Sequence, residues 1–262
     1  MKIRLFFLLC SVLLMLSSCV STKRITYLQD SQAEIDSLIQ VERIQKPYRI
    51  QINDLLSIRV KAMDQHLVGM FNPIGEGELS ATGEERLYYD GFLVDRHGNI
   101  RVPTLGELNV LGYTVEEVRE MIEKTLIENY FKEEANIFVT VKLAGIRYTT
   151  IGEIGVGSQV IYKEQVTIME AIANAGDITE YGDRTNVVIL RQYPSGQKKH
   201  HIDLTSIDAV KSPYYYIQPN DLIIVNPLPQ KALGLGTTGL ATLQTATMLL
   251  TLITSTIFLI TR

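Results

Sequence analysis

Both ends of this chain of 262 residues are strongly apolar, whereas the sequence between them is polar and charged. Residues 5–16 form a predominantly apolar run after Lys2 and Arg4, and residues 232–261 contain no charged side chain. The N-terminal run is too short to span a bilayer and fits the hydrophobic region of a secretory signal peptide. The body between the two ends is therefore expected to fold outside the cytoplasm.

The signal-like region ends in the sequence Leu-Ser-Ser-Cys19, in which a hydrophobic residue and two small residues precede a cysteine. This pattern resembles the bacterial lipobox, whose cysteine is lipidated and becomes the first mature residue. The resemblance implies a lipoprotein signal peptide over 1–18 and a lipid on Cys19. The alternative is an ordinary signal peptide with an incidental cysteine. Val20 follows, and by the bacterial sorting rule the absence of Asp there implies the outer membrane, with the body in the periplasm.

The charge and cysteine content exclude several classes of protein. Cleavage before Cys19 removes Cys10, and lipidation uses Cys19, so a mature chain would have no thiol for a disulfide, for catalysis or for a metal. Loss of Lys2 and Arg4 takes the formal net charge from −4 to −6. A chain of this charge lacks the basic footprint of a nucleic-acid-binding protein.

The C-terminal apolar stretch is rich in threonine and predicts a transmembrane helix over 231–262. At 100° per residue, one face of this helix gathers hydroxyl and amide groups and the other face is aliphatic. The candidate pore-facing residues on the polar face are Gln244, Thr247, Thr251, Thr254 and Ser255. A two-faced helix suits a ring of helices with lipid outside and water inside. The alternative is a single-pass anchor whose threonine hydroxyls bond to carbonyls of their own helix.

Two globular modules are expected between the ends, at 47–144 and 145–230, after a polar tether over 19–46. The first module combines alternating strand patterns with a helix that begins with the capping box Thr114-Val-Glu-Glu117. The second combines a strand, a glycine-rich turn and a short helix that begins with a similar box. Strands and helices mixed in this way predict an α+β fold.

One short sequence occurs in both modules. It reads Ile-Gln-Ile-Asn53-Asp54-Leu-Leu in the first and Ile-Gln-Pro-Asn220-Asp221-Leu-Ile in the second. An Asn-Asp pair between apolar runs is typical of a tight turn between strands. Because the flanking sequences differ, we interpret the similarity as one turn chemistry used twice rather than as a true repeat.

The first module resembles the bacterial polysaccharide export domain, whose signature is an extended Tyr-x-Ile, a Gly-Asp turn and a Leu-x-Ile strand. The corresponding residues here are Tyr48-Arg-Ile, Asn53-Asp54 and Leu56-Ser-Ile58. Asn replaces the glycine of the turn, and Asn also adopts positive φ. The resemblance therefore identifies Asn53 and Asp54 as the signature turn of this domain.

The second module resembles the SLBB motif, a β-grasp-like ligand-binding module. The Gly-Glu that follows a strand in this motif is Gly152-Glu153, its Thr-x-x-Glu-Ala-Ile is 167–172, and its Ala-Gly is Ala175-Gly176. Together with the lipobox and the apolar C-terminus, these motifs resemble the Wza-type outer-membrane polysaccharide export lipoproteins. One SLBB-like module is found, where some members have two or more, so a shorter periplasmic body is expected.

Membership of that family implies a homo-oligomeric ring, with an octamer as the candidate size, that exports capsular polysaccharide or exopolysaccharide. The implied partners are the polysaccharide, outer-membrane lipid and an inner-membrane polysaccharide co-polymerase or tyrosine kinase. The implied fold class is α+β: a small β-rich export domain, a β-grasp-like SLBB domain and a C-terminal transmembrane helix. The alternative is a monomeric glycan-binding or scaffolding lipoprotein of a polysaccharide assembly system.

No pattern in the sequence points to an enzyme, a metal site or a cofactor. The four histidines lack a second ligand at metal-binding spacing, and neither a Walker loop, a dinucleotide loop nor a Gly-x-Ser-x-Gly turn is found. Lys198-Lys-His-His201 is interpreted as an exposed hairpin flank, with contact to an acidic glycan as the alternative. The tyrosines 214–216 suit stacking on sugar rings, but a half-buried strand is the preferred interpretation.

Overall fold

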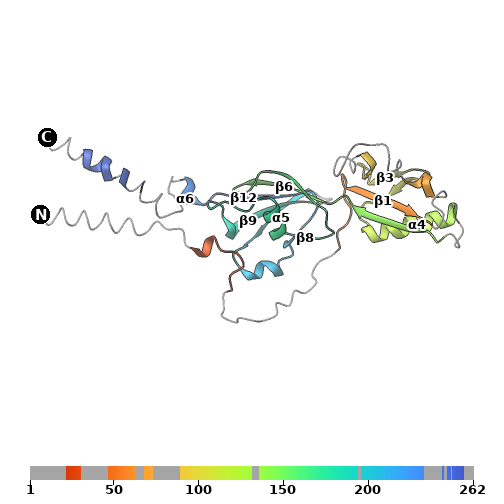
Figure 1. Ribbon diagram of the computed structural model, residues 1–262, viewed down its shortest axis with the longest axis horizontal. Helices are drawn as coiled ribbons and strands as arrows, with labels where there is room; N and C mark the ends of the chain where they lie inside the picture. Colours follow the sequence, from red (N-terminus) through yellow and green to blue (C-terminus); the bar gives the residue numbers. More distant parts are fainter. Residues whose placement is uncertain are drawn as a thin grey trace.

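The computed structural model of the protein describes most of both modules and short pieces beyond them (Figure 1). The described residues are 22–30, 47–62, 68–72, 89–131, 136–193, 196–232, 244, 247–248 and 250–256. The predicted signal peptide over 1–18 and the predicted lipidation site Cys19 lie outside these ranges.

The first module consists of an antiparallel sheet of order β2-β1-β5, the hairpin β3–β4 and one long helix, α4. Its elements are β1 (Leu55–Lys61), η2 (Gly69–Phe71), β2 (Phe92–Leu93), β3 (Asn99–Val102), β4 (Gly106–Asn109), α4 (Val115–Asn129) and β5 (Phe138–Leu143). Apolar residues alternate along β1, so that Leu56, Ile58 and Val60 point into the core. The opposite sheet face carries the exposed Arg59 and Lys61.

Helix α4 covers the core face of this sheet. The predicted capping box is present, because the Thr114 hydroxyl accepts from the Glu117 N–H and the Glu117 carboxylate accepts from the Thr114 N–H. Its buried residues Val118, Ile122 and Leu126 recur at every fourth position and pack in the same cluster as β1 and β5. The sequence pattern therefore predicted both the start and the buried face of this helix.

The second module is built on a mixed five-stranded sheet of order β10-β9-β12-β6-β7. Its strands are β6 (Ile146–Gly152), β7 (Gly157–Ile161), β9 (Val187–Tyr193), β10 (Gly196–Ile202) and β12 (Asp221–Val225). The first strand β6 and the last strand β12 run parallel at the centre, and all other pairs are antiparallel. The β-grasp-like and SLBB assignments of this module stay predictions.

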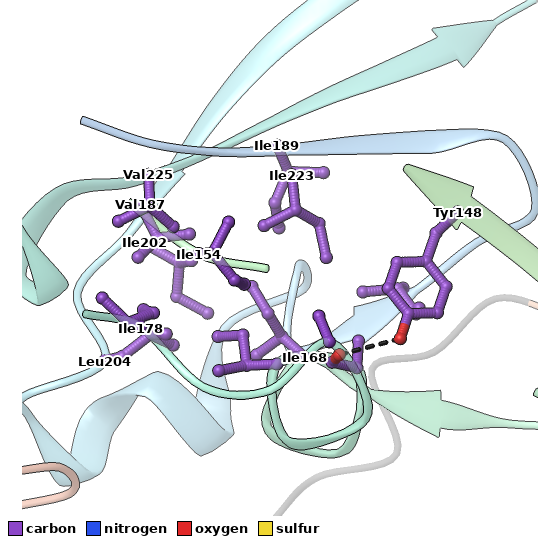
Figure 2. Packing of buried hydrophobic residues seen from close by; sticks show 14 of the residues in the cluster. Tyr148, Ile154, Ile168, Ile178, Val187, Ile189, Ile202, Leu204, Ile223 and Val225 are labelled. Atoms are coloured by element: carbon purple, nitrogen blue, oxygen red, sulfur yellow. Dashed lines mark hydrogen bonds between the residues drawn. The ribbon is translucent and has the colours of Figure 1, made fainter. Parts of the chain in front are cut away.

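A short helix and a small ladder close the core of the second module (Figure 2). They are α5 (Ile168–Asn174) and the pair β8 (Val166–Thr167) and β11 (Tyr216–Ile217), and the 3-10 turns are η4 (Arg184–Asn186) and η5 (Ile207–Lys211). Tyr148 of β6 is fully buried and donates its hydroxyl to the Ala171 carbonyl at 2.8 Å. This bond ties α5 to the sheet and satisfies a polar group that burial would otherwise leave unpaired.

The chain passes from one module to the other through only two residues, Ala144 and Gly145, between β5 and β6. Gly145 has φ of +90°, and a Cβ there would lie 2.9 Å from the Cγ1 atom of Val160. A larger residue would be both strained and crowded at this point. The modules are therefore joined by a short, closely packed connection.

Residues 22–30, which we call the N-terminal strap, pack on the second module rather than hang free from it. The strap begins with η1 (Thr22–Arg24), and the N–H of Leu28 donates to the Leu204 carbonyl at 3.0 Å. The Tyr27 hydroxyl donates to Asp177 at 2.6 Å. No local sequence pattern indicates this docking, because it depends on groups far away along the chain.

The predicted transmembrane helix over 231–262 is wrong. In the described part of the chain, no helix combines the length and the hydropathy that crossing a membrane requires. Helix α6 (Pro229–Ala232) follows β12 at the end of the second module. The mixed α+β content of the modules agrees with the predicted class.

Candidate functional site

The duplicated Asn-Asp sequence forms the same turn in both modules. Asn53 has φ of 70° and Asn220 has φ of 66°, a conformation that Asn tolerates better than most residues. In each turn the aspartate N–H donates to the carbonyl of the glutamine three residues earlier, at 3.2 Å. In each turn the aspartate also accepts from that glutamine's N–H, at 2.8 Å for Asp54 and 2.7 Å for Asp221. The interpretation of one turn chemistry used twice therefore agrees with the geometry.

Asp54 carries a buried carboxylate. Among the described residues, none of its hydrogen-bond partners is a cation. Its side chain is 3% exposed and its Oδ2 atom accepts from the Tyr48 hydroxyl at 2.7 Å. Burial raises the pKa of Asp54 to about 6, against the opposing effect of the bonds from the Gln51 N–H and Tyr48. Burial and the nearby carboxylates also raise the pKa of Tyr48. Tyr48, the first residue of the predicted signature, thus holds the signature aspartate.

Asp221 is held differently, by a buried bidentate ion pair with Arg191 of β9. The Nε–Oδ1 and Nη2–Oδ2 distances are 2.9 and 2.7 Å, and both side chains are almost fully buried. Burial raises the pKa of Asp221, and Arg191 opposes this rise. Arg191 also donates to the Tyr216 carbonyl at 3.0 Å, so one guanidinium joins β9, β11 and the turn.

The two turns meet where the modules join, although they are distant along the chain. The Asn220 Nδ2 atom lies 3.4 Å from Asp54 Oδ1, and the Asn220 N–H donates to the Arg147 carbonyl at 2.6 Å. A pocket opens beside this contact, lined by both turns, by the Ala144-Gly145 connection and by side chains of the β6–β7 hairpin. We call it the junction pocket.

The third predicted turn, Gly152-Glu153, lies at the opposite end of the second module. Strand β6 starts at the junction and ends at Gly152, where a Cβ would lie 2.1 Å from the Val225 carbonyl oxygen. Glu153 accepts from Lys231 of α6 at 2.5 Å and from the Thr179 hydroxyl at 2.7 Å, and the bond from Lys231 lowers its pKa. The glycine is needed for close backbone approach, and the glutamate fastens α6 to the module.

The six predicted turn residues therefore do not form one site. Asn53, Asp54, Asn220 and Asp221 come together at the junction, whereas Gly152 and Glu153 lie at the far end of the sheet. Sequence reasoning missed Arg147 and Tyr162, which line the junction pocket, and Arg191, which pairs with Asp221. The only local signal for Arg147 is its charge within a strand, between two apolar residues, Ile146 and Tyr148, that are buried.

The remaining candidates lie away from the junction pocket. Tyrosines 214–216 are all partly buried, and the Tyr214 ring stacks on His200 with centroids 3.9 Å apart. Burial lowers the pKa of His200.

The candidate pore-facing residues Gln244, Thr247, Thr251, Thr254 and Ser255 are all exposed. The Thr251 and Thr254 hydroxyls donate to carbonyls of their own helix. Their predicted pore-facing role depended on the spanning helix. Within the described residues, no three His, Cys, Asp or Glu are placed to hold a metal ion.

Residues 42–143 match the family model of the polysaccharide biosynthesis/export protein. The match ends at the last residue of β5, so it includes the turn of Asn53 and Asp54, helix α4 and the whole sheet of the first module. The second module lies beyond it. The matched family is one of export rather than of enzymes and favours association with the cell envelope. The first module thus supports a role of this chain in polysaccharide export or biosynthesis.

Proposed function

We propose that this protein is a lipid-anchored outer-membrane component of polysaccharide export, of the Wza type, whose copies form a ring around the passing polymer. The observation that carries the proposal is the family match over the first module, residues 42–143. In this proposal the second module is an SLBB domain and the polymer is a capsular polysaccharide or exopolysaccharide.

The placement of the chain ends supports an orientation relative to the membrane. The N-terminal strap docks on the second module through Tyr27, Leu28 and Gln29, and only two residues separate its first residue Thr22 from Cys19, a span of at most about 11 Å. Helix α6 is fastened to the same end of the module by the Lys231–Glu153 pair. Figure 1 shows η1 and α6 on the side of the second module that lies away from the first. A lipid on Cys19 would hold this end at the membrane and project the first module into the periplasm.

The charges of the first module support head-to-tail contact between copies. Helix α4 presents the exposed acidic residues Glu116, Glu117, Glu120 and Glu128. The sheet face on the opposite side of the module presents Arg59 and Lys61. Opposite charges on opposite faces suit a heterologous contact, which closes into a ring when its rotation allows. Weak contacts around a wide ring also fit a hydrophilic polymer that must pass rather than stay bound.

Mass measurement of the intact protein, extracted from membranes in mild detergent, tests this proposal. A stable ring of many subunits is the expected result, and a monomer would favour the scaffolding or glycan-binding alternative. Lys61→Glu should weaken the ring, and combining it with Glu120→Lys should restore it in part. Lys211→Glu, an exposed lysine of the second module, is the matched control and should leave the mass unchanged. Deletion of the gene should also abolish surface polysaccharide.

A further inference from the structure

The junction pocket is lined by apolar and polar residues, and each module contributes both kinds. Leu55 and Leu143 of the first module and Val160 of the second supply apolar surface. Arg147 lies on the outer face of β6, because its neighbours Ile146 and Tyr148 point into the core. Tyr162, next to the end of β7, is 58% exposed and also lines the pocket. A hydrophobic surface with a few convergent polar groups is the usual make-up of a small-molecule site.

The carboxylate of Asp54, which lines the pocket, has unused capacity to accept hydrogen bonds. Asp54 Oδ2 accepts two bonds shorter than 3 Å, from Tyr48 and from the Gln51 N–H. Among the described residues, Asp54 Oδ1 has only the 3.4 Å contact with Asn220. A carboxylate oxygen can accept two donors, so this buried atom is poorly satisfied and lies at the edge of an open pocket. A ligand that brings a hydroxyl donor would satisfy it.

The groups around the pocket match one class of ligand. A pyranose ring has apolar C–H faces that suit an exposed tyrosine ring, and its hydroxyls both donate and accept. Asp54 can accept from a hydroxyl, while Arg147 and the amides of Asn53 and Asn220 can donate to sugar oxygens. A phosphate or a metal ion fits this pocket less well. The Asp54 carboxylate would repel a phosphate, and among the described residues it has no partner ligands for a metal ion.

We propose that the junction pocket binds one pyranose unit of the exported polysaccharide, which donates a hydroxyl to Asp54 Oδ1 and packs its ring on Tyr162. The proposal rests on the proposed function for the identity of the polymer. Because Asn53 and Asp54 come from the first module and Tyr162 and Asn220 from the second, a bound sugar would contact both modules. The sugar would then stabilise the contact between the two modules.

Saturation-transfer NMR on the full chain in detergent tests the pocket directly. The probes are four hexasaccharides: maltohexaose, cellohexaose, mannohexaose and hexagalacturonate. The expected result is transfer to at least one of them. Tyr162→Ala should weaken binding about five-fold through loss of the ring contact, whereas Tyr162→Phe should retain it. Tyr89→Ala, an exposed tyrosine outside the pocket, is the matched control and should bind like the parent protein.

The outcomes separate this inference from the proposed function. Absence of transfer to all four probes at millimolar concentration overturns the pocket proposal, as does equal transfer in the parent, Tyr162→Ala and Asp54→Asn proteins. Circular dichroism of each variant establishes that a loss of binding is not a loss of folding. If the pocket binds nothing while the ring mass and the deletion phenotype are as expected, the site is wrong and the function stands.

Discussion

The buried carboxylate of Asp54 should make the stability of the protein fall as pH rises through the weakly acidic range. Burial raises its pKa from 3.8 to about 6. Between these two values the folded state binds more protons than the unfolded state, so the free energy of unfolding decreases with rising pH. A shift of about two units corresponds to about 3 kcal/mol, fully expressed above the folded pKa.

Asp54→Asn removes this titration while keeping the shape of the side chain. The amide oxygen can still accept from the Tyr48 hydroxyl and from the Gln51 N–H, and the Asn220 amide can turn to offer its carbonyl to the new Nδ2. Relative to the parent, the variant should gain stability between pH 4 and pH 7, by up to about 3 kcal/mol over the interval. Urea unfolding followed by circular dichroism at half-unit steps of pH measures the difference.

Asp95→Asn provides the control. The Asp95 carboxylate is exposed in a hairpin turn and accepts bonds from the N–H groups of Asn99 and His97, which lower its pKa. Its contribution to stability is therefore lost as pH falls, so the difference between this variant and the parent should change in the opposite direction. If the parent and Asp54→Asn give parallel curves from pH 4 to pH 7, Asp54 is not a buried titrating group and the reasoning fails.

Three further predictions follow from other parts of the molecule. Cys19→Ala should prevent acylation, and incorporation of labelled palmitate into the variant would refute the lipobox interpretation. Leu126→Ala, in the fully buried stripe of α4, should cost about 2–5 kcal/mol of unfolding free energy, whereas Lys124→Ala on the exposed face should cost little, as thermal unfolding will show. Tyr27→Ala removes the aromatic ring of the strap, whose centroid lies 5.1 Å from the Arg184 guanidinium, so hydrogen exchange at the Leu28 amide should accelerate. Unchanged exchange would mean that the docking of the strap does not depend on this ring.

Local patterns predicted the parts of the fold that local forces determine. The capping boxes at Thr114 and Thr167 both form, and the apolar spacing of α4 identified its buried face. Glu123 shows the limit of such patterns: its spacing suggests an exposed residue, but its carboxylate pairs with Arg119 and accepts from the Val139 N–H. Lys124, whose side chain is exposed, is therefore the surface control for the helix.

What the sequence could not predict are contacts between distant segments. The Asn220–Asp54 contact joins residues far apart in the chain, as does the pairing of Arg191 with Asp221, and no period or spacing encodes either. The hydropathy of the C-terminal stretch, by contrast, predicted a spanning helix that the described residues do not form.

The same turn occurs in both modules, but its two copies have different neighbours and therefore different roles. Both aspartates cap the turn through the glutamine N–H, so the turn alone does not distinguish them. Arg191 engages both oxygens of Asp221, which leaves that carboxylate fixed and closed to a ligand. Asp54 has the neutral hydroxyl of Tyr48 on one oxygen and only a long amide contact on the other. The second turn is therefore the rigid support of the junction, and the first is the one that can respond to a proton or to a sugar.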